Sequence, residues 1–418
     1  MKYIKKDCGA YNLHIIKTDK FKTITVDVNF LSKIKKEEIT IRNFVCDMLT
    51  CSSKNYPTKR LLSKKSNELY GVSVISKNSR IGNYTSFSVT ANFLNEKFSE
   101  EGMLEKSMEF LFDIIFNPNV VNNKFDTISF NIVKNQIKDE ILSFKDDKIK
   151  YSMLKMLSNM GDAPYSYLGY GYISDMDLIN EENLYDYYKN MLKSEKVDIF
   201  VIGDVDIDNI NNIVKKYVKI NTKKKELTNI VISHNKINTR SKEFKDFELL
   251  NQSKLNIGIK LPELTFFESR YVMPLYNEIL GGGSDSKLFK FVREKNSLCY
   301  YVTSLFNIYD NLMIIYSGIN KNDYFKTVDL IKKQLAAIRA GRVTEEELNL
   351  AKKSMISSVN TIEDYSSRII SMYYTKELIG NDDIKDKILN INKVKIEDIV
   401  NLSKKIKLDT IHLLYGDE

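Results

Sequence analysis

The sequence predicts an α+β protein made of two duplicated domains, each a mostly antiparallel sheet packed with helices. Two observations lead to this prediction. Strand-rich and helix-rich runs follow one another in the same order in each half of the chain. Each half also closes on an apolar run followed by Gly-Asp, first at Gly203-Asp204 and then at Gly416-Asp417. A chain of 418 residues is also too long for one ordinary core.

The first half begins with two β-rich runs, residues 13–16 and 23–30, which flank a polar turn and predict antiparallel strands. An amphipathic helix over 37–51 follows from apolar residues at helical spacing, namely Ile41, Phe44, Val45, Met48 and Leu49. The other elements expected in this half are a helix over 59–70, strands from 71 to 93, helices over 101–116, 124–160 and 181–192, and a buried strand over 197–204.

The second half repeats this order. We expect strands over 244–250 and 254–261, a helix over 267–280, a glycine loop, a second helix, strands from 300 to 319, helices over 323–340 and 344–378, and a last strand from 411. The predicted domains are therefore 1–220 and 241–418. Residues 221–240 are charged and have no clear periodicity, which is typical of a linker.

Composition narrows the class of protein. The net charge is +8, but 55 acidic residues are interspersed with 63 basic ones, which indicates a solvated surface and no nucleic-acid interface. Four cysteines without CxxC spacing are expected to be reduced thiols, as in the cytoplasm. The first residues lack the apolar segment of a signal peptide, and no run of about 18 apolar residues suggests a membrane span. We expect a cytoplasmic protein without a membrane partner.

The stretch from Leu280 to Tyr301 predicts helix, glycine loop, helix and strand. Gly281, Gly282 and Gly283 end an apolar helical run, and the residues after them return to helical spacing. The loop lacks the second glycine, lysine and serine or threonine of a Walker phosphate loop, so nucleotide binding is disfavoured. Arg293 precedes Tyr300 by seven residues, and the helix-to-strand turn between them could direct a cation and a phenol into one cleft. Spacing alone favours the simpler interpretation, a surface arginine and a half-buried tyrosine.

These segments together resemble the pitrilysin/insulinase peptidases, particularly the short two-domain type that includes processing peptidases. The stretch from the glycine loop through Arg293 to Tyr300 is similar to the C-terminal-domain motif of that family. Three further similarities occur in the family's order, at Tyr56-Pro57, at Pro164-Tyr165 with Gly169, and at Gly203-Asp204. The likeness extends over essentially the whole chain.

The resemblance also shows what this chain lacks. Active members carry His-x-x-Glu-His on the first helix, where two imidazoles hold Zn²⁺ and the glutamate deprotonates a metal-bound water. Counting back from Tyr56-Pro57, these positions are occupied by Asn43, Cys46 and Asp47. A cysteine cannot replace a carboxylate that takes up and returns a proton. The further glutamate ligand of the family corresponds to Glu140, which equally fits an exposed helical carboxylate.

Other uses of these residues are less favoured by the sequence. Asn43, Asp47 and Glu140 offer oxygen ligands that suit Mg²⁺ or Ca²⁺ better than Zn²⁺, but they make a sparse site. The three histidines are not spaced as zinc ligands: His14 and His412 lie in predicted strands, and His234 lies in the predicted linker. Cys46 has no neighbouring base that would make it a nucleophile, so a buried thiol is the simpler interpretation.

The resemblance therefore implies a catalytically defective subunit that holds no zinc or other cofactor of its own. In short two-domain members the cleft forms between two subunits, so a zinc-bearing homologue could supply the metal while Arg293, Tyr300 and the glycine loop serve the peptide substrate. This predicts a heterodimer, with a homodimer as the other possibility. A non-catalytic peptide-binding or scaffold protein is the alternative. A stand-alone metallopeptidase ranks third.

Overall fold

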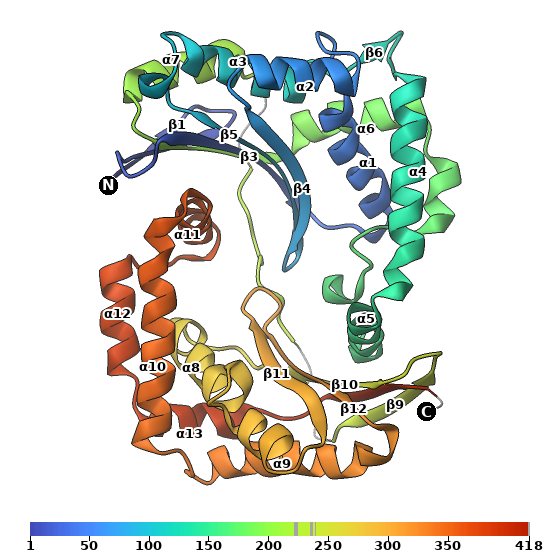
Figure 1. The fold of residues 1–418 in the computed structure, drawn as a ribbon, viewed down its shortest axis with the longest axis vertical. Helices are drawn as coiled ribbons and strands as arrows, with labels where there is room; N and C mark the ends of the chain where they lie inside the picture. The colour runs from blue at the N-terminus through green and yellow to red at the C-terminus, as the bar shows by residue number, and fades with distance from the viewer. Residues whose placement is uncertain (221–224, 235–236, 239, 417–418) are drawn as a thin grey trace. The chain divides into compact units, whose positions relative to one another are not determined.

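The computed structural model describes residues 1–220, 225–234, 237–238 and 240–416, which form two compact units (Figure 1). The described residues of 1–143, 168–228 and 364–374 form the first unit. Those of 144–167, 229–363 and 375–416 form the second. Neither unit is one continuous stretch of sequence, because each half of the chain contributes a segment to the unit built mainly from the other half.

The first unit contains a six-stranded sheet in the order β1-β2-β8-β3-β5-β4. β2 and β8 run parallel, and every other neighbouring pair is antiparallel. The strands are β1 (Lys2–Asp7), β2 (Asn12–Lys17), β3 (Thr23–Lys33), β4 (Ser73–Ile81), β5 (Tyr84–Leu94) and β8 (Lys196–Gly203). The two strands predicted at 13–16 and 23–30 are present. They are not neighbours in the sheet, however, because β8, which comes much later in the sequence, lies between them.

The second unit contains a five-stranded sheet in the order β11-β12-β10-β13-β9. Its one parallel pair is β13 with β9. The strands are β9 (Lys242–Phe247), β10 (Ser253–Lys260), β11 (Cys299–Asn307), β12 (Leu312–Ile319) and β13 (Thr410–Tyr415). The last strand, predicted from residue 411, is β13, and Asp417 of the closing Gly-Asp lies outside the described residues.

The two sheets have the same topology. Starting from β2, the first sheet reads β2-β8-β3-β5-β4, and the second reads β9-β13-β10-β12-β11 with the strands in matching sequence order. The single parallel pair occupies the same place in both. Among the described strands of the two sheets, only β1 has no counterpart. The predicted α+β class with duplicated, mostly antiparallel sheets is therefore confirmed.

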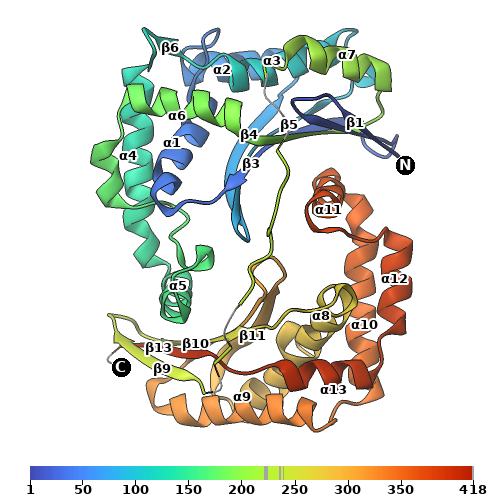
Figure 2. The same cartoon turned by 180° about the vertical axis from the view of Figure 1, so that it is seen from behind.

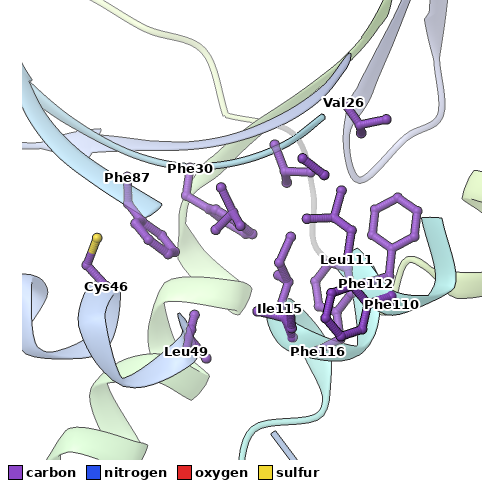
Figure 3. Close-up of a cluster of buried hydrophobic side chains, with 14 of the residues drawn as sticks. Val26, Phe30, Cys46, Leu49, Phe87, Phe110, Leu111, Phe112, Ile115 and Phe116 are labelled. Atoms are coloured by element: carbon purple, nitrogen blue, oxygen red, sulfur yellow. The ribbon is translucent and has the colours of Figure 1, made fainter. Parts of the chain in front are cut away.

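Helices cover one face of the first sheet and enclose its core. Alternate residues of β3 project toward them, with Val26 and Phe30 completely buried. Figure 3 shows these two side chains beside those of α3, including Leu111 and Ile115. The helices of this unit are α1 (Ile39–Cys51), α2 (Lys59–Glu68), α3 (Met103–Phe116), α4 (Thr127–Ser143), α6 (Glu181–Ser194) and α7 (Ile207–Tyr217).

The helix predicted over 124–160 is divided, and its second part belongs to the other unit. α5 (Lys148–Met160) begins at Asp147, whose carboxylate accepts a hydrogen bond from the backbone of Lys150 at 3.1 Å. It packs on β10 and β13 in the second unit, where Asn256 donates to Ser152 at 2.6 Å. Figure 1 shows α5 beside the second sheet.

The helix predicted over 344–378 is divided in a corresponding way, into α10 (Glu345–Asn360) and α11 (Ser366–Ile379). The first part of α11 belongs to the first unit. Ser366 hydrogen-bonds Thr25 of β3 at 2.8 Å, and Tyr374 makes an edge contact with Phe200 of β8. α5 and α11 therefore take equivalent places in the two halves, each on the sheet that belongs mainly to the other half.

The remaining helices surround the second sheet. The helix predicted over 267–280 runs from Glu268 to Gly282, with π-helical turns at 268–272 and 278–282 on either side of α8 (Met273–Asn277). A short π-helix over Phe289–Glu294 follows the glycine loop. The others are α9 (Tyr324–Arg339), α12 (Ile384–Lys393) and α13 (Ile396–Lys405). Within the described ranges, no helix is both long and apolar enough to cross a membrane.

The predicted linker, 221–240, lies partly outside the described residues. Residues 225–228 belong to the first unit, and the described residues from 229 onward pack against the second unit. Ile232 is buried and its backbone N–H donates to the carbonyl of Tyr309 at 2.9 Å. Asn238 donates to the carboxylate of Asp409 at 2.8 Å. This part of the linker is therefore held in place by the second core.

Candidate functional site

The three glycines of the loop have different structural roles. A Cβ on Gly281 would lie 2.8 Å from the backbone nitrogen of Ser304 in β11, which is closer than real Cβ atoms come. A Cβ on Gly282 would meet only the side chain of Glu278, and one on Gly283 has space. Gly281 therefore lets the end of the helix approach β11, and the other two glycines are not required by packing.

The turn between Arg293 and Tyr300 is closed by two backbone hydrogen bonds. The N–H of Ser297 donates to the carbonyl of Arg293 at 2.9 Å, and the N–H of Leu298 donates to the carbonyl of Val292 at 3.1 Å. Ser297 has a positive φ of 51°, so it takes the left-handed position that ends many helices. This helix end fixes the direction in which the chain enters β11.

Tyr300 lies at a β-bulge at the start of β11. The pairing with β12 shifts between Cys299 and Tyr301, so Tyr300 is the extra residue of the bulge. A bulge redirects a side chain away from the regular alternation of a strand. Its phenol is 76% exposed.

Arg293 and Tyr300 line the same open hollow of about 370 Å³, together with Ser297, Cys299 and Asn320. Arg293 is exposed, and its guanidinium lies over the ring of Phe289 at 4.7 Å. The structure thus brings a cation and a phenol to one surface, where both can reach a ligand. The sequence alone left open whether they faced a common site.

Asn43, Cys46 and Asp47 occupy the positions of the zinc motif of active relatives and are called here the degenerate metal motif. Its first residue, Asn43, forms hydrogen bonds within the protein. The amide nitrogen of Asn43 donates to the carbonyl of Gly169 at 2.8 Å. Its amide oxygen accepts from Asn78 of β4 at 2.7 Å. Asn43 therefore connects α1 to the edge strand and to the loop before α6.

The second position, Cys46, lies in the first core and is 4% exposed. Figure 3 shows it on α1 in the same cluster as Phe87. Burial is the main cause that raises the pKa of its thiol to about 12. A thiol that stays protonated at neutral pH is a poor nucleophile, and it binds a metal ion only by giving up its proton.

The third position, Asp47, is influenced by Glu140 of α4. Burial raises the pKa of Asp47 to about 6, and the negative charge of Glu140 adds to the effect. Glu140 itself is exposed and accepts a hydrogen bond from Gln136 at 3.2 Å. The structure therefore brings Glu140 near the motif, as the resemblance implies, but as one of two mutually repelling carboxylates.

This set of side chains does not suit zinc. The motif offers an amide with both atoms hydrogen-bonded, a buried neutral thiol and two carboxylates, instead of two imidazoles and a general base. Mg²⁺ or Ca²⁺ would prefer oxygen ligands, but Asn43 offers a neutral oxygen that already accepts a hydrogen bond from Asn78, so the set is sparse. In the part of the chain that the structure describes, no group of three or more His, Cys, Asp or Glu side chains is placed to hold a metal ion.

Arg42, next to Asn43, is a structural residue that sequence reasoning did not single out. It is 1% exposed and forms a two-point ion pair with Glu195, in which Nη2 donates to Oε2 at 2.8 Å. The same Nη2 lies 3.0 Å from the carbonyl oxygen of Phe30. Burial would lower the pKa of Arg42, but Glu195 reverses the effect and raises it. A charge inside an apolar helical run was the available signal.

The histidines serve structural networks. His14 of β2 lies 3.2 Å from the carboxylate of Asp198 and 2.8 Å from the hydroxyl of Tyr3. Burial would raise the pKa of Asp198, but hydrogen bonds from His14 and the adjacent Lys196 lower it below its usual range. In the second unit His412 lies 3.0 Å from Asp246, and burial lowers the pKa of His412.

His234 remains apart from both networks. Its Nε2 lies 2.9 Å from the carbonyl oxygen of Asp310, and burial lowers its pKa. Because His14, His234 and His412 all bond protein groups at separate places, the structure gives no zinc site built from them among the described residues.

Comparison with known proteins identifies the family. The sequence profile described as Peptidase M16 inactive domain matches residues 179–355. The probable inactive metalloprotease YmfF of Bacillus subtilis (strain 168) is 30% identical over 420 residues, which cover 99% of this chain and 98% of that protein. The chain therefore belongs to the M16 family of pitrilysin/insulinase-type peptidases. Within it, the chain is an inactive peptidase homologue.

Other relatives include both a protein named for zinc and solved structures. The uncharacterized zinc protease YmxG of Bacillus subtilis (strain 168) is 26% identical over 306 residues, covering 72% of each chain. A conserved protein from Enterococcus faecalis V583 has a TM-score of 0.93 and 28% identity over 99% of both chains. A peptidase M16 inactive domain from Pseudomonas fluorescens has a TM-score of 0.80 at 15% identity, which shows the shared fold.

Proposed function

We propose that this chain is the non-catalytic subunit of a two-subunit M16 peptidase, in which a zinc-bearing homologue supplies the metal. The observation that carries the proposal is a contrast between its two motifs. In the degenerate metal motif, Asn43 forms hydrogen bonds within the protein and Cys46 is packed in the core. By contrast, Arg293 and Tyr300 are exposed and line one hollow. A side-chain pair with no metal of its own can still act on a substrate held at a partner's zinc.

The chemistry of the pair suits a peptide substrate. A guanidinium and a phenol can both donate hydrogen bonds to a scissile carbonyl or to the oxyanion that forms from it. These donors would stabilise the negative charge on that oxygen, and a zinc ion held by the partner would supply the activation of the attacking water. We therefore place Arg293 and Tyr300 at the substrate carbonyl and assign the metal and the general base to the partner.

The resemblance to two-domain members, whose cleft forms between subunits, supports a heterodimer. Bacillus subtilis offers a parallel, since it has one relative named as an inactive metalloprotease and another named as a zinc protease. A genome that encodes this chain should therefore also encode an M16 protein with an intact His-x-x-Glu-His motif.

The test is steady-state peptide cleavage by the chain reconstituted with that zinc-bearing homologue. Arg293→Ala and Tyr300→Phe should each lower kcat by about 10²-fold, the scale of losing an oxyanion donor, while gel filtration shows an intact complex. Arg342→Ala removes another exposed arginine and should leave kcat unchanged. Wild-type kcat for both variants in an intact complex would exclude the role in trans.

The second candidate function is a peptide-binding or scaffold protein. The observation that favours it is the outer edge of β4, beside α1, with which no strand of the described residues pairs and where Ile75 is 63% exposed. An extended peptide can add to such an edge through backbone hydrogen bonds. For this function, the chain alone should bind an extended peptide, and Arg293→Ala and Tyr300→Phe should leave the turnover of any partner unchanged.

A further inference from the structure

The duplicated topology leaves one strand position unfilled in the second unit. In the first sheet, β1 pairs antiparallel with the outer edge of β2. β9 is the counterpart of β2, but no strand among the described residues pairs with its outer edge (Figure 2). The first unit therefore shows that an antiparallel strand can occupy this position in the fold.

The backbone of β9 is oriented to accept such a strand. The N–H groups of Lys242 and Glu248 donate inward, to the carbonyls of Asp409 and Tyr415, both at 2.9 Å. Alternate residues of a strand direct their backbone groups to opposite sides. Glu243, Lys245 and Phe247 therefore direct their N–H and C=O groups toward the free edge.

We propose that the occupant is a second copy of this chain, which pairs β9 with β9 across a two-fold axis at Phe244. The charges of β9 carry this choice. In an antiparallel pair centred on Phe244, Lys242 lies opposite Asp246 of the second copy, and Glu243 lies opposite Lys245 of the second copy. Each lysine then faces an acid, and the two Phe244 rings face one another at the axis.

Neighbouring registers lack this match. Centring the pair on Glu243 places two glutamates directly opposite one another, and centring it on Lys245 places two lysines opposite one another. A register shifted by one residue on one strand would place a residue whose backbone groups point to the free edge opposite a residue whose backbone groups point to β13. The backbone hydrogen bonds between the two copies would then not form. Lysine on an edge strand usually protects it from pairing. In β9, however, the lysines and acids are ordered so that each lysine of one copy lies opposite an acid of the other copy.

Apolar side chains near the edge add surface that a second copy would cover. Phe247 is 53% exposed, Leu249 is 81% exposed and Phe325 is 74% exposed. Phe325 lies beside β9, because the amine of Lys245 is 5.1 Å from its ring centre. A strand pair alone buries less than the roughly 1,200 Å² of a stable interface, so these side chains would supply part of the remainder.

This interface goes beyond the proposed peptidase role. β11, which carries Tyr300, lies at the opposite edge of the same sheet from β9. Pairing at β9 therefore leaves the Arg293 and Tyr300 side of the sheet accessible. The two proposals can succeed or fail separately.

The test is sedimentation equilibrium of the purified full-length chain with charge-reversed variants. Wild type should form a reversible dimer. Glu243→Lys alone opposes lysine to lysine, and Lys245→Glu alone opposes glutamate to glutamate, so each should raise the dimer Kd by about tenfold or more. An equimolar mixture should restore the dimer, because the mixed pair has opposite charges at both positions.

The folding of each variant is checked by its melting temperature, because Glu243 also accepts a hydrogen bond from Tyr324 at 3.0 Å. If Glu243→Lys unfolds the chain, Lys242→Glu tests the same register on an exposed side chain by opposing it to Asp246, and it must weaken the dimer. A wild-type chain that stays monomeric, or that binds only other proteins at this edge, would overturn the proposal. Variants that dimerise alone as wild type does would overturn it as well.

Discussion

Arg42 and Glu195 form a two-point ion pair inside the first core, and both side chains are almost completely buried. The pair joins α1 to Glu195, the residue between α6 and β8, which lies 153 positions further along the chain. Arg42 directly precedes Asn43, the first position of the degenerate metal motif. The helix that carries zinc in active relatives is therefore fixed here by a structural charge pair.

Breaking this pair should strongly destabilise the first unit. Arg42→Met leaves the carboxylate of Glu195 buried without a partner, which costs about 3–5 kcal/mol of unfolding free energy. The double variant Arg42→Met with Glu195→Met should recover most of the loss. Urea unfolding measures both, with exposed Arg60→Ala as the control. A loss below about 1 kcal/mol for the single variant would contradict this role.

Asp47 should make the chain less stable as pH rises. Its pKa is about 6 in the folded state against 3.8 for the ordinary side chain, so between these values the folded state binds more protons than the unfolded state. Stability therefore falls as pH rises from about 4 to about 6, and the loss persists at neutral pH. Asp47→Asn should raise the unfolding free energy at pH 7 by about 1–2 kcal/mol.

The measurement for Asp47 is urea unfolding of wild type and Asp47→Asn at pH 4 and pH 7. The difference between them should appear at pH 7 and nearly vanish at pH 4. Glu140→Gln is the matched variant, because it removes the neighbouring charge without changing Asp47, and it should give a smaller gain. An equal difference at both pH values would show that burial of the Asp47 charge is not the cause.

The glycine loop should tolerate change at one end and not at the other. Gly281→Ala places a methyl group against the backbone of β11 and should cost about 1–3 kcal/mol. Gly283→Ala meets open space at an extended φ of −162° and should stay within about 0.5 kcal/mol of wild type. Thermal unfolding compares the two. Equal costs would mean that close approach to β11 does not explain Gly281.

Metal removal should leave this chain unchanged. Its zinc-motif positions do not suit the ion, so dialysis against a chelator should not shift the melting temperature, and metal analysis should find no stoichiometric zinc. Tightly held zinc with a lower melting temperature after chelation would show that Asn43, Cys46 and Asp47 have been assigned to the wrong positions.

A designed variant provides the positive control for metal analysis. Asn43→His, Cys46→Glu and Asp47→His together rebuild the ligand spacing of the active family, and this variant should gain zinc affinity if Glu140 is the remaining ligand. Glu140→Gln in that background should then remove the gain. Activity need not return. In the wild-type chain, Asn78 and Gly169 form hydrogen bonds with Asn43, and they are not the partners that would orient an imidazole toward a metal.

Local patterns predicted much of this fold. Helical and alternating spacings located most elements, and their repeated order predicted the duplicated α+β class. The helix-to-strand spacing between Arg293 and Tyr300 left open whether the two side chains face one surface, and in the structure both line one hollow. These are properties of short segments, in which the residues that decide the structure are close in sequence.

The parts that sequence did not predict depend on distant residues. No local pattern indicates that β8 enters between β2 and β3, or that α5 packs on β10. Asn43 is held by Asn78 and Gly169, which lie 35 and 126 positions away. Arg42 and Asp198 did carry a signal, because each is a charge in an apolar run and must find a buried partner.

The exchange of α5 and α11 has a consequence for how the chain is made. A ribosome releases the strands of the first sheet early, yet the segment 364–374 that completes this unit is among the last to emerge. Until then, Thr25 and Phe200 lack their contacts with Ser366 and Tyr374. Part of the first sheet therefore stays uncovered until nearly the whole chain has been translated.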